Sequence, residues 1–134
     1  MPVLTNMQQI PERVWVDFLR ANLIPPEEIP MIVPLERSFF MLSIPDVGFL
    51  VTSQRLVIYR KKFMRGLVKH DEVLLLQLKR FSYSSYERGH EFFFGFAEGK
   101  EYWVKIAVNA KEAQLIAAKL LQLVPTLECE KSLL

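Results

Sequence analysis

The chain has 134 residues, of which 51% are hydrophobic and 24% are charged, and its formal net charge is +2. These values fit one globular domain with its own core and exclude a disordered chain. A net charge this small does not by itself indicate a nucleic-acid-binding protein. The single cysteine, Cys129, cannot form an internal disulfide, and a reducing, cytoplasmic location is therefore predicted.

The N-terminal part of the chain predicts one helix. Pro11 and Glu12 are typical of a helix start, because proline fits the first turn and an acidic residue favours the positive end of the helix dipole. Apolar residues then recur on one face, at Val14, Trp15, Phe18 and Leu19. We therefore assign residues 1–27 to an N-terminal helical extension.

Residues 28–125 predict about seven strands followed by one helix. Prolines make residues 29–35 an edge-like strand. Apolar residues on both faces make residues 38–44 a central or covered strand. Residues 48–63 hold two apolar runs around a four-residue polar break, which predicts a tight antiparallel hairpin that ends in a basic tip.

The last predicted element is an amphipathic helix. Asn109 and Glu112 have the spacing of a capping box, and Pro125 ends the helix. Its buried stripe consists of Ala113, Ile116, Ala117, Leu120 and Val124. Residues 126–134 then predict a flexible tail.

A sequence motif is centred on the polar break between the two apolar runs. It spans ten positions, Leu50-Val51-Thr52-x-x-Arg55-Leu56-Val57-Ile58-Tyr59. This pattern resembles the Thr-x-x-Arg-Leu hairpin of bacterial pleckstrin-homology-like domains and of the related GRAM domains. The resemblance covers residues 28–124 and implies a mostly β fold, a β-barrel or two crossed antiparallel sheets, closed by a C-terminal helix. The N-terminal helix lies outside the minimal form of that fold.

Catalytic chemistry has little support in the sequence. His70 and His90 are predicted in solvated loops, without a nearby cysteine or a Gly-x-Ser-x-Gly context. The five glycines are scattered singly, so no phosphate-binding loop is present. We expect no catalytic, cofactor-binding or metal site and no enzymatic activity.

The basic tip is the first candidate site. Its cationic residues are Arg60, Lys61, Lys62 and Arg65, and Phe63 and Met64 lie among them. Cations at a hairpin end can converge on phosphate groups, while apolar side chains enter a lipid interface. An anionic membrane surface is one possible partner, and an anionic protein or nucleic acid is another. The alternative is a solvated strand end that protects the hairpin from edge pairing.

An aromatic patch is the second candidate site. Tyr83, Tyr86, Phe93 and Trp103 are predicted to share a sheet face, where they form either an interface or ordinary cross-strand packing. The ten phenylalanines and the apolar two-faced strands favour a non-catalytic module that binds a protein or self-associates as a homo-oligomer. The alternative function is peripheral binding to anionic lipid headgroups through the basic tip. Nucleic acid is not the expected partner.

Overall fold

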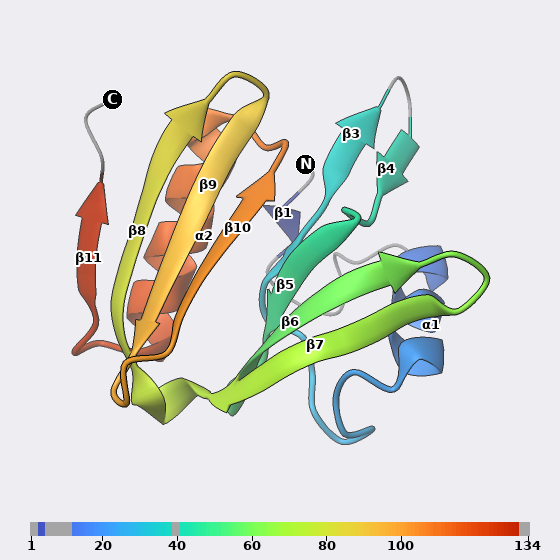
Figure 1. The fold of residues 1–134 in the computed structure, drawn as a ribbon, viewed down its shortest axis with the longest axis horizontal. Helices are drawn as coiled ribbons and strands as arrows, with labels where there is room; N and C mark the ends of the chain where they lie inside the picture. The colour runs from blue at the N-terminus through green and yellow to red at the C-terminus, as the bar shows by residue number, and fades with distance from the viewer. Residues whose placement is uncertain (1–2, 5–11, 39–40, 132–134) are drawn as a thin grey trace.

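The computed structural model describes residues 3–4, 12–38 and 41–131 (Figure 1). Three parts of the sequence-based predictions lie outside the described residues. These are the helix start at Pro11, the middle of the strand predicted over residues 38–44, and the last three residues of the tail. The side chains of Val14 and Trp15 lie outside the description as well.

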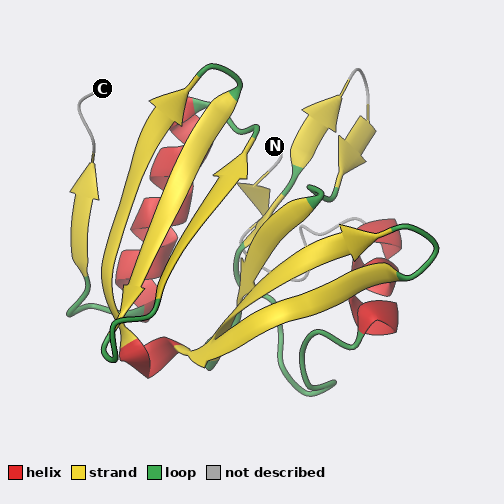
Figure 2. Ribbon diagram, viewed as in Figure 1, coloured by secondary structure: helices red, strands yellow, loops and turns green. Residues whose placement is uncertain are grey.

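Strands dominate the described residues and form two main sheets that pack on each other (Figure 2). The first sheet is antiparallel and consists of β5 Val47–Val51, β6 Arg55–Lys62 and β7 Gly66–Leu74. A 3-10 turn, η2 Leu75–Gln77, links it to the second sheet. That sheet consists of antiparallel β8 Leu78–Tyr86, β9 Gly89–Phe96 and β10 Glu101–Ile106, with β11 Glu128–Lys131 parallel to β8.

Two helices and two short strand pairs complete the described fold. They are α1 Glu12–Ala21, α2 Ala110–Leu123, the pair β1 Val3–Leu4 with β2 Val33–Pro34, and the pair β3 Glu36–Ser38 with β4 Met41–Ser43. The predicted mostly β class with a C-terminal helix is confirmed. A closed barrel is not formed, because β5 and β10 lie near each other but no hydrogen-bonded ladder joins these two described strands.

The first core fills the space between the two sheets and α2. Phe49 of β5 places its ring 5.5 Å from Phe92 and 4.8 Å from Phe94 of β9, centroid to centroid. From α2, Ile116 and Leu120 enter the same cluster and are fully buried. The predicted helix stripe is confirmed, and so is the capping box of Asn109 and Glu112, which starts this helix at the position the sequence indicates.

A second core covers the opposite face of the first sheet. Phe18 of α1 packs edge-to-face on Tyr59 of β6, with ring centroids 5.8 Å apart. Leu23 and Ile24 follow α1 and are buried with Leu50, Val57 and Leu67 of the sheet. Figure 1 shows α1 beside β6 and β7, on the side away from the second sheet. The strands β5 and β6 are therefore apolar on both faces because this chain itself covers both faces.

Residues 38–44 do not form the single strand that the sequence predicts. They contribute to two short antiparallel strands, β3 and β4, in which Ser38 pairs with Met41. A continuous apolar run satisfies the pattern of a buried strand, but the pattern does not reveal where the chain reverses.

Residues 126–134 are predicted as a flexible tail, and the structure differs. Leu127 is buried in the first core, and β11 then runs along the edge of β8, with Cys129 opposite Phe81. The free edge of β8 offers backbone donors and acceptors, which stabilise a neighbouring strand whatever its local composition. Residues 132–134 lie outside the described part of the chain.

Candidate functional site

The start of β6 is a turn held by buried polar groups. Thr52 is fully buried, and its Oγ1 accepts hydrogen bonds from the backbone N–H of Gln54 and Arg55, both at 3.1 Å. The same hydroxyl donates to Glu28 Oε1 at 2.7 Å. Arg55 binds Glu28 with Nε at 3.0 Å and Nη2 at 2.7 Å, and Glu72 with Nη1 at 3.1 Å. The Thr-x-x-Arg motif thus has a structural role here.

The charges of this turn shift the pKa values of its members. The hydrogen bond to Glu28 is the main cause that raises the pKa of Arg55 above its usual value, against the effect of burial. The hydrogen bond from Lys69 is the main cause that lowers the pKa of Glu72, and the charge of Arg55 adds to it. Both groups therefore stay charged at neutral pH, and their charges form ion pairs with other side chains of the protein.

The other end of β6 is the hairpin tip, which we define as residues 60–66. A hydrogen bond from the Arg65 N–H to the Lys62 carbonyl closes the turn at 3.1 Å. Met64 and Gly66 have positive φ values of 64° and 71°. Phe63 and Met64 are the most exposed large hydrophobic residues of the described chain, at 92% and 89%. Neither contributes to a core, so their presence at this place has no packing reason.

The predicted cations of the tip are present around these two side chains. Arg60, Lys61, Lys62 and Arg65 are all exposed. Lys61 lies 3.9 Å from the exposed carboxylate of Asp46, which is a weak surface contact. Within the described residues, no carboxylate forms an ion pair with the other three cations. The tip therefore combines uncompensated positive charge with exposed apolar surface.

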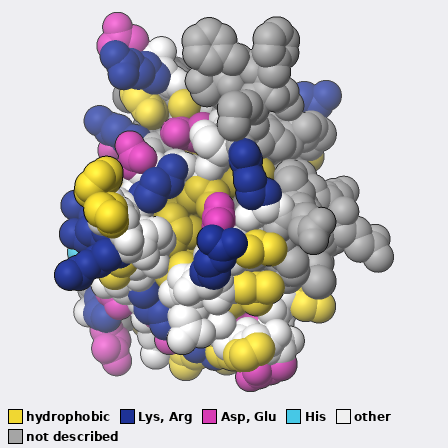
Figure 3. All heavy atoms as spheres, turned by 90° about the vertical axis from the view of Figure 1, so that its right-hand side faces the viewer, with side chains coloured by type: hydrophobic (Ala, Val, Ile, Leu, Met, Phe, Trp, Pro, Cys, Tyr) yellow, Lys and Arg dark blue, Asp and Glu magenta, His cyan; other side chains and the backbone are white. Residues whose placement is uncertain are grey.

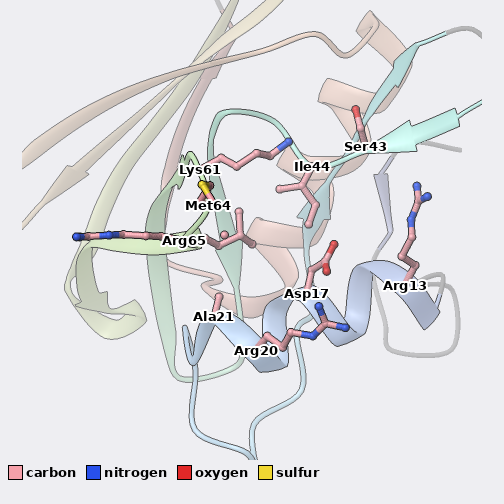
Figure 4. Close-up of a pocket in the computed structure, with 11 residues that line it drawn as sticks. Arg13, Asp17, Arg20, Ala21, Ser43, Ile44, Lys61, Met64 and Arg65 are labelled. Carbon is pink, nitrogen blue, oxygen red and sulfur yellow. The ribbon is translucent and has the colours of Figure 1, made fainter.

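A hollow of about 490 Å³ lies between the hairpin tip and α1 (Figure 4). Lys61 and Met64 line it from the tip, and Arg13, Asp17 and Arg20 line it from α1. In Figure 4 the side chain of Lys61 is directed across the hollow toward the Ser43–Ile44 segment, whereas that of Arg65 extends to the opposite side of the hairpin.

The face of the molecule that carries α1 and the tip is rich in cations. Figure 3 shows Lys and Arg side chains spread over this face, with hydrophobic side chains exposed between them. Arg13 and Arg20 were not among the predicted site residues. Their spacing with Asp17, four and three residues apart, places all three on one helix face, and this signal is readable from the sequence. The sequence does not reveal that this face lies beside the hairpin.

The aromatic patch is only partly assembled as predicted. Tyr86, Phe93 and Trp103 lie on the outer face of the second sheet, where Phe93 and Trp103 have ring centroids 5.1 Å apart. Trp103 is 58% exposed, and Lys105 Nζ lies 5.3 Å from the centre of the Tyr86 ring. Tyr83 belongs to the first core on the other face and cannot contribute to a surface patch.

The two histidines differ from the expected solvated loops. His70 is exposed but lies within β7. His90 lies within β9 and is buried, with Nδ1 2.8 Å from the carbonyl oxygen of Val108. Glu112 is buried near the same end of the sheet, and its Oε2 accepts no hydrogen bond from described protein groups. In the described part of the chain, no group of three His, Cys, Asp or Glu residues could hold a metal ion.

Comparisons with protein-family models, with curated proteins and with solved structures give no match for this chain. Among the described helices, none has both the length and the apolar character needed to cross a bilayer. The case for function therefore rests on the geometry of the chain's own surface.

Proposed function

We propose that the protein binds anionic lipid surfaces peripherally, through the hairpin tip. The observation that carries this proposal is the exposure of Phe63 and Met64 at a protruding turn whose flanking side chains are cations. The proposal keeps the cytoplasmic location that the sequence predicts, with reversible attachment to a membrane.

The two kinds of side chain at the tip contribute in different ways. Each basic residue near an acidic leaflet contributes roughly 1 kcal/mol of attraction. Full removal of a Phe or Met side chain from water contributes about 1.5–3 kcal/mol, and insertion to the depth of the headgroups gives a part of that. Stable attachment generally needs two such signals together, and the tip has both.

Sedimentation with phosphatidylcholine vesicles, with and without phosphatidylserine, tests the proposal. The wild type is expected to sediment only with the acidic vesicles and to be released by salt, because the Debye length falls from about 10 Å at 0.1 M to about 3 Å at 1 M. The variant Lys61→Glu/Lys62→Glu is expected to lose binding and keep its fold, because exposed charges contribute little to stability. Failure of the wild type to sediment at low salt would end the proposal.

A matched control separates the tip from overall charge. Lys79 and Lys111 are exposed cations of β8 and α2, and Lys79→Glu/Lys111→Glu changes the net charge by the same amount. This variant is expected to keep most of the vesicle binding. Phe63→Ser/Met64→Ser is expected to weaken binding while leaving its salt dependence unchanged. Equal losses in the tip and control charge variants would mean that overall charge, and not the tip, governs binding.

The proposal includes a pleckstrin-homology-like fold for residues 28–125, preceded by an N-terminal extension. Its support is the Thr52-x-x-Arg55-Leu56 hairpin together with the antiparallel strands β5–β7 of the first sheet, the antiparallel strands β8–β10 of the second, and a C-terminal helix. The role proposed for the tip does not depend on this likeness, because it follows from the exposed side chains alone.

Binding of a protein partner, including a second copy of this chain, is the other candidate function. The apolar residues on both faces of β5 and β6 do not support self-association, because the second core covers the face that is turned away from the second sheet. Trp103, which packs at a tilt against Phe93, supports it instead, since exposed tryptophan is enriched at interfaces. Light scattering of the wild type and of Trp103→Ser tests it: a dimer that the substitution dissociates is expected, and a wild-type monomer at high concentration would remove the candidate.

A further inference from the structure

A second hollow lies at the end of the second sheet, where the turn between β8 and β9 meets the start of α2 (Figure 1). Its volume of about 460 Å³ is within the range of small-molecule sites, roughly 300–1,000 Å³. Tyr86, Arg88 and His90 line it from the β8–β9 hairpin, and Asn109 and Glu112 line it from the start of α2. It shares no residue with the hairpin tip, so a site here is independent of the proposed membrane attachment.

Glu112 is a buried carboxylate of which only one oxygen has a partner. Its Oε1 accepts a hydrogen bond from the backbone N–H of Asn109 at 2.8 Å, which is part of the capping box. Its Oε2 accepts no hydrogen bond from the described groups, although Glu112 is only 5% exposed. A buried acceptor that lacks a donor destabilises the folded state. Since Glu112 lines the hollow, a ligand in the hollow is placed to supply that donor.

The imidazole of His90 adds a second acceptor to the hollow. Its Nδ1 lies 2.8 Å from the carbonyl oxygen of Val108, which can only accept, so Nδ1 carries the hydrogen of this bond. In the neutral ring Nε2 is then an acceptor. Two acceptors, one of them on a carboxylate, favour a ligand group that is cationic and only donates. A primary ammonium group has both properties.

Arg88 gives the open side of the hollow the opposite character. It lies in the turn between β8 and β9 and is exposed, and no described carboxylate forms an ion pair with it. A guanidinium group binds a carboxylate with two parallel hydrogen bonds. The hollow therefore offers a buried anion and an exposed cation to the same ligand.

We propose that this hollow binds a small zwitterion, an amino acid or a short peptide, with its ammonium group on Glu112 and its carboxylate on Arg88. A simple anion is not the expected ligand, because Glu112 already occupies the positive end of the α2 dipole and repels further negative charge. Ala107 and Val108 also line the hollow and give an apolar side chain of the ligand a surface to contact.

Calorimetry with leucine, γ-aminobutyrate and leucyl-leucine tests the inference, because these probes hold the two charged ends at different separations. At least one is expected to bind at millimolar concentration or below, and the best of them distinguishes a free amino acid from a peptide. The N-acetyl derivative and the C-terminal amide of that probe should each bind at least about tenfold more weakly, since each lacks one charged contact. No binding of any probe, or equal binding of either derivative, would overturn the inference.

Three variants locate the binding. Glu112→Gln keeps an acceptor for the capping box but replaces Oε2 by an amide donor, so the best probe should bind at least about tenfold more weakly. Arg88→Gln should weaken the probe and leave its C-terminal amide unaffected. Glu87→Gln is the matched control, because Glu87 is exposed in the same turn and does not line the hollow, and it should bind like the wild type.

Thermal unfolding of each variant verifies that the fold is intact. If Glu112→Gln proves unfolded, Arg88→Gln and the two derivatives still decide the question. Undiminished binding by a folded Glu112→Gln, or by Arg88→Gln, would overturn the inference. None of these outcomes bears on vesicle binding by the hairpin tip, so the proposed function stands or fails separately.

Discussion

The two ends of β6 use the same kinds of side chain for different purposes. At its start, Arg55 is held by Glu28 and Glu72, and the hydroxyl of Thr52 has three hydrogen bonds. At its far end, Lys62 and its cationic neighbours have almost no acidic partners among the described residues. The comparison teaches that a cation whose partner lies within the chain stabilises the fold, whereas a cation without one is available to a ligand.

The largest expected difference is between Phe49 in the first sheet and Phe63 in the hairpin tip. Phe49 is fully buried between Phe92 and Phe94, so Phe49→Ala should lower the free energy of unfolding by about 3–5 kcal/mol. Phe63→Ala removes an exposed ring and should change it by less than about 0.5 kcal/mol. Urea denaturation measures both. A substantial loss of stability in Phe63→Ala would show that the tip packs against the protein.

The next difference is between two arginines of β6. In Arg55→Ala the carboxylate of Glu28 loses its cation, although the side chain of Glu28 is only 10% exposed. The free energy of unfolding should therefore fall by about 2 kcal/mol. Arg60→Ala, in the exposed tip, should cost less than about 0.5 kcal/mol. The matched control is the second variant, measured by the same denaturation experiment. Equal costs would contradict the distinction between the two ends.

Tyr59, within β6, sharpens the comparison at alkaline pH. Its hydroxyl is buried without a hydrogen-bond partner among the described groups, and burial raises the pKa of Tyr59 far above its usual value. Since the unfolded tyrosine ionises near pH 10, the stability of the wild type should fall as pH rises above about 10. Tyr59→Phe should remove this contribution and increase stability at pH 7 by about 1 kcal/mol. A destabilised variant would mean that the hydroxyl has a partner.

The smallest expected effect is at acidic pH. The pKa of Glu72 is lowered in the folded protein, chiefly by Lys69. The stabilisation that Glu72 gives to the folded state is therefore complete above the pKa of the unfolded chain and is lost as pH falls through the folded pKa. In Glu72→Gln the free energy of unfolding should therefore depend less on pH below about pH 4.5 than in the wild type. At pH 7 it should be lower than that of the wild type by about 0.2–1 kcal/mol. Thermal unfolding over a pH series measures this, with Glu98→Gln at an exposed turn as the control.

The elements with strong local signals could be predicted from the sequence. The hairpin of β5 and β6 and the capping box of α2 depend on neighbouring residues, and both are present. The strand β11 and the hairpin of β3 and β4 depend on where distant edges lie, and periodicity does not encode that.

The candidate sites divide in the same way. The cations of the tip lie within six consecutive residues, so the sequence predicts them as one group, whereas Arg13 and Arg20 join them only through the docking of α1. Tyr83 is a different case: it is three residues from Tyr86 in one strand, and an odd separation puts two side chains on opposite faces. Strand parity would have excluded one of the two from a shared patch.

The division of the interior into two cores has a consequence for biosynthesis. The second core is built from residues up to Leu67, whereas the first core needs residues up to Leu127. During translation, α1 can therefore dock on β5 to β7 before β8 and the later strands leave the ribosome. The opposite face of that nascent sheet, with Phe49 and Ile58, then stays uncovered until the strands of the second sheet are synthesised. For that interval the growing chain presents an apolar surface of the kind that chaperones bind.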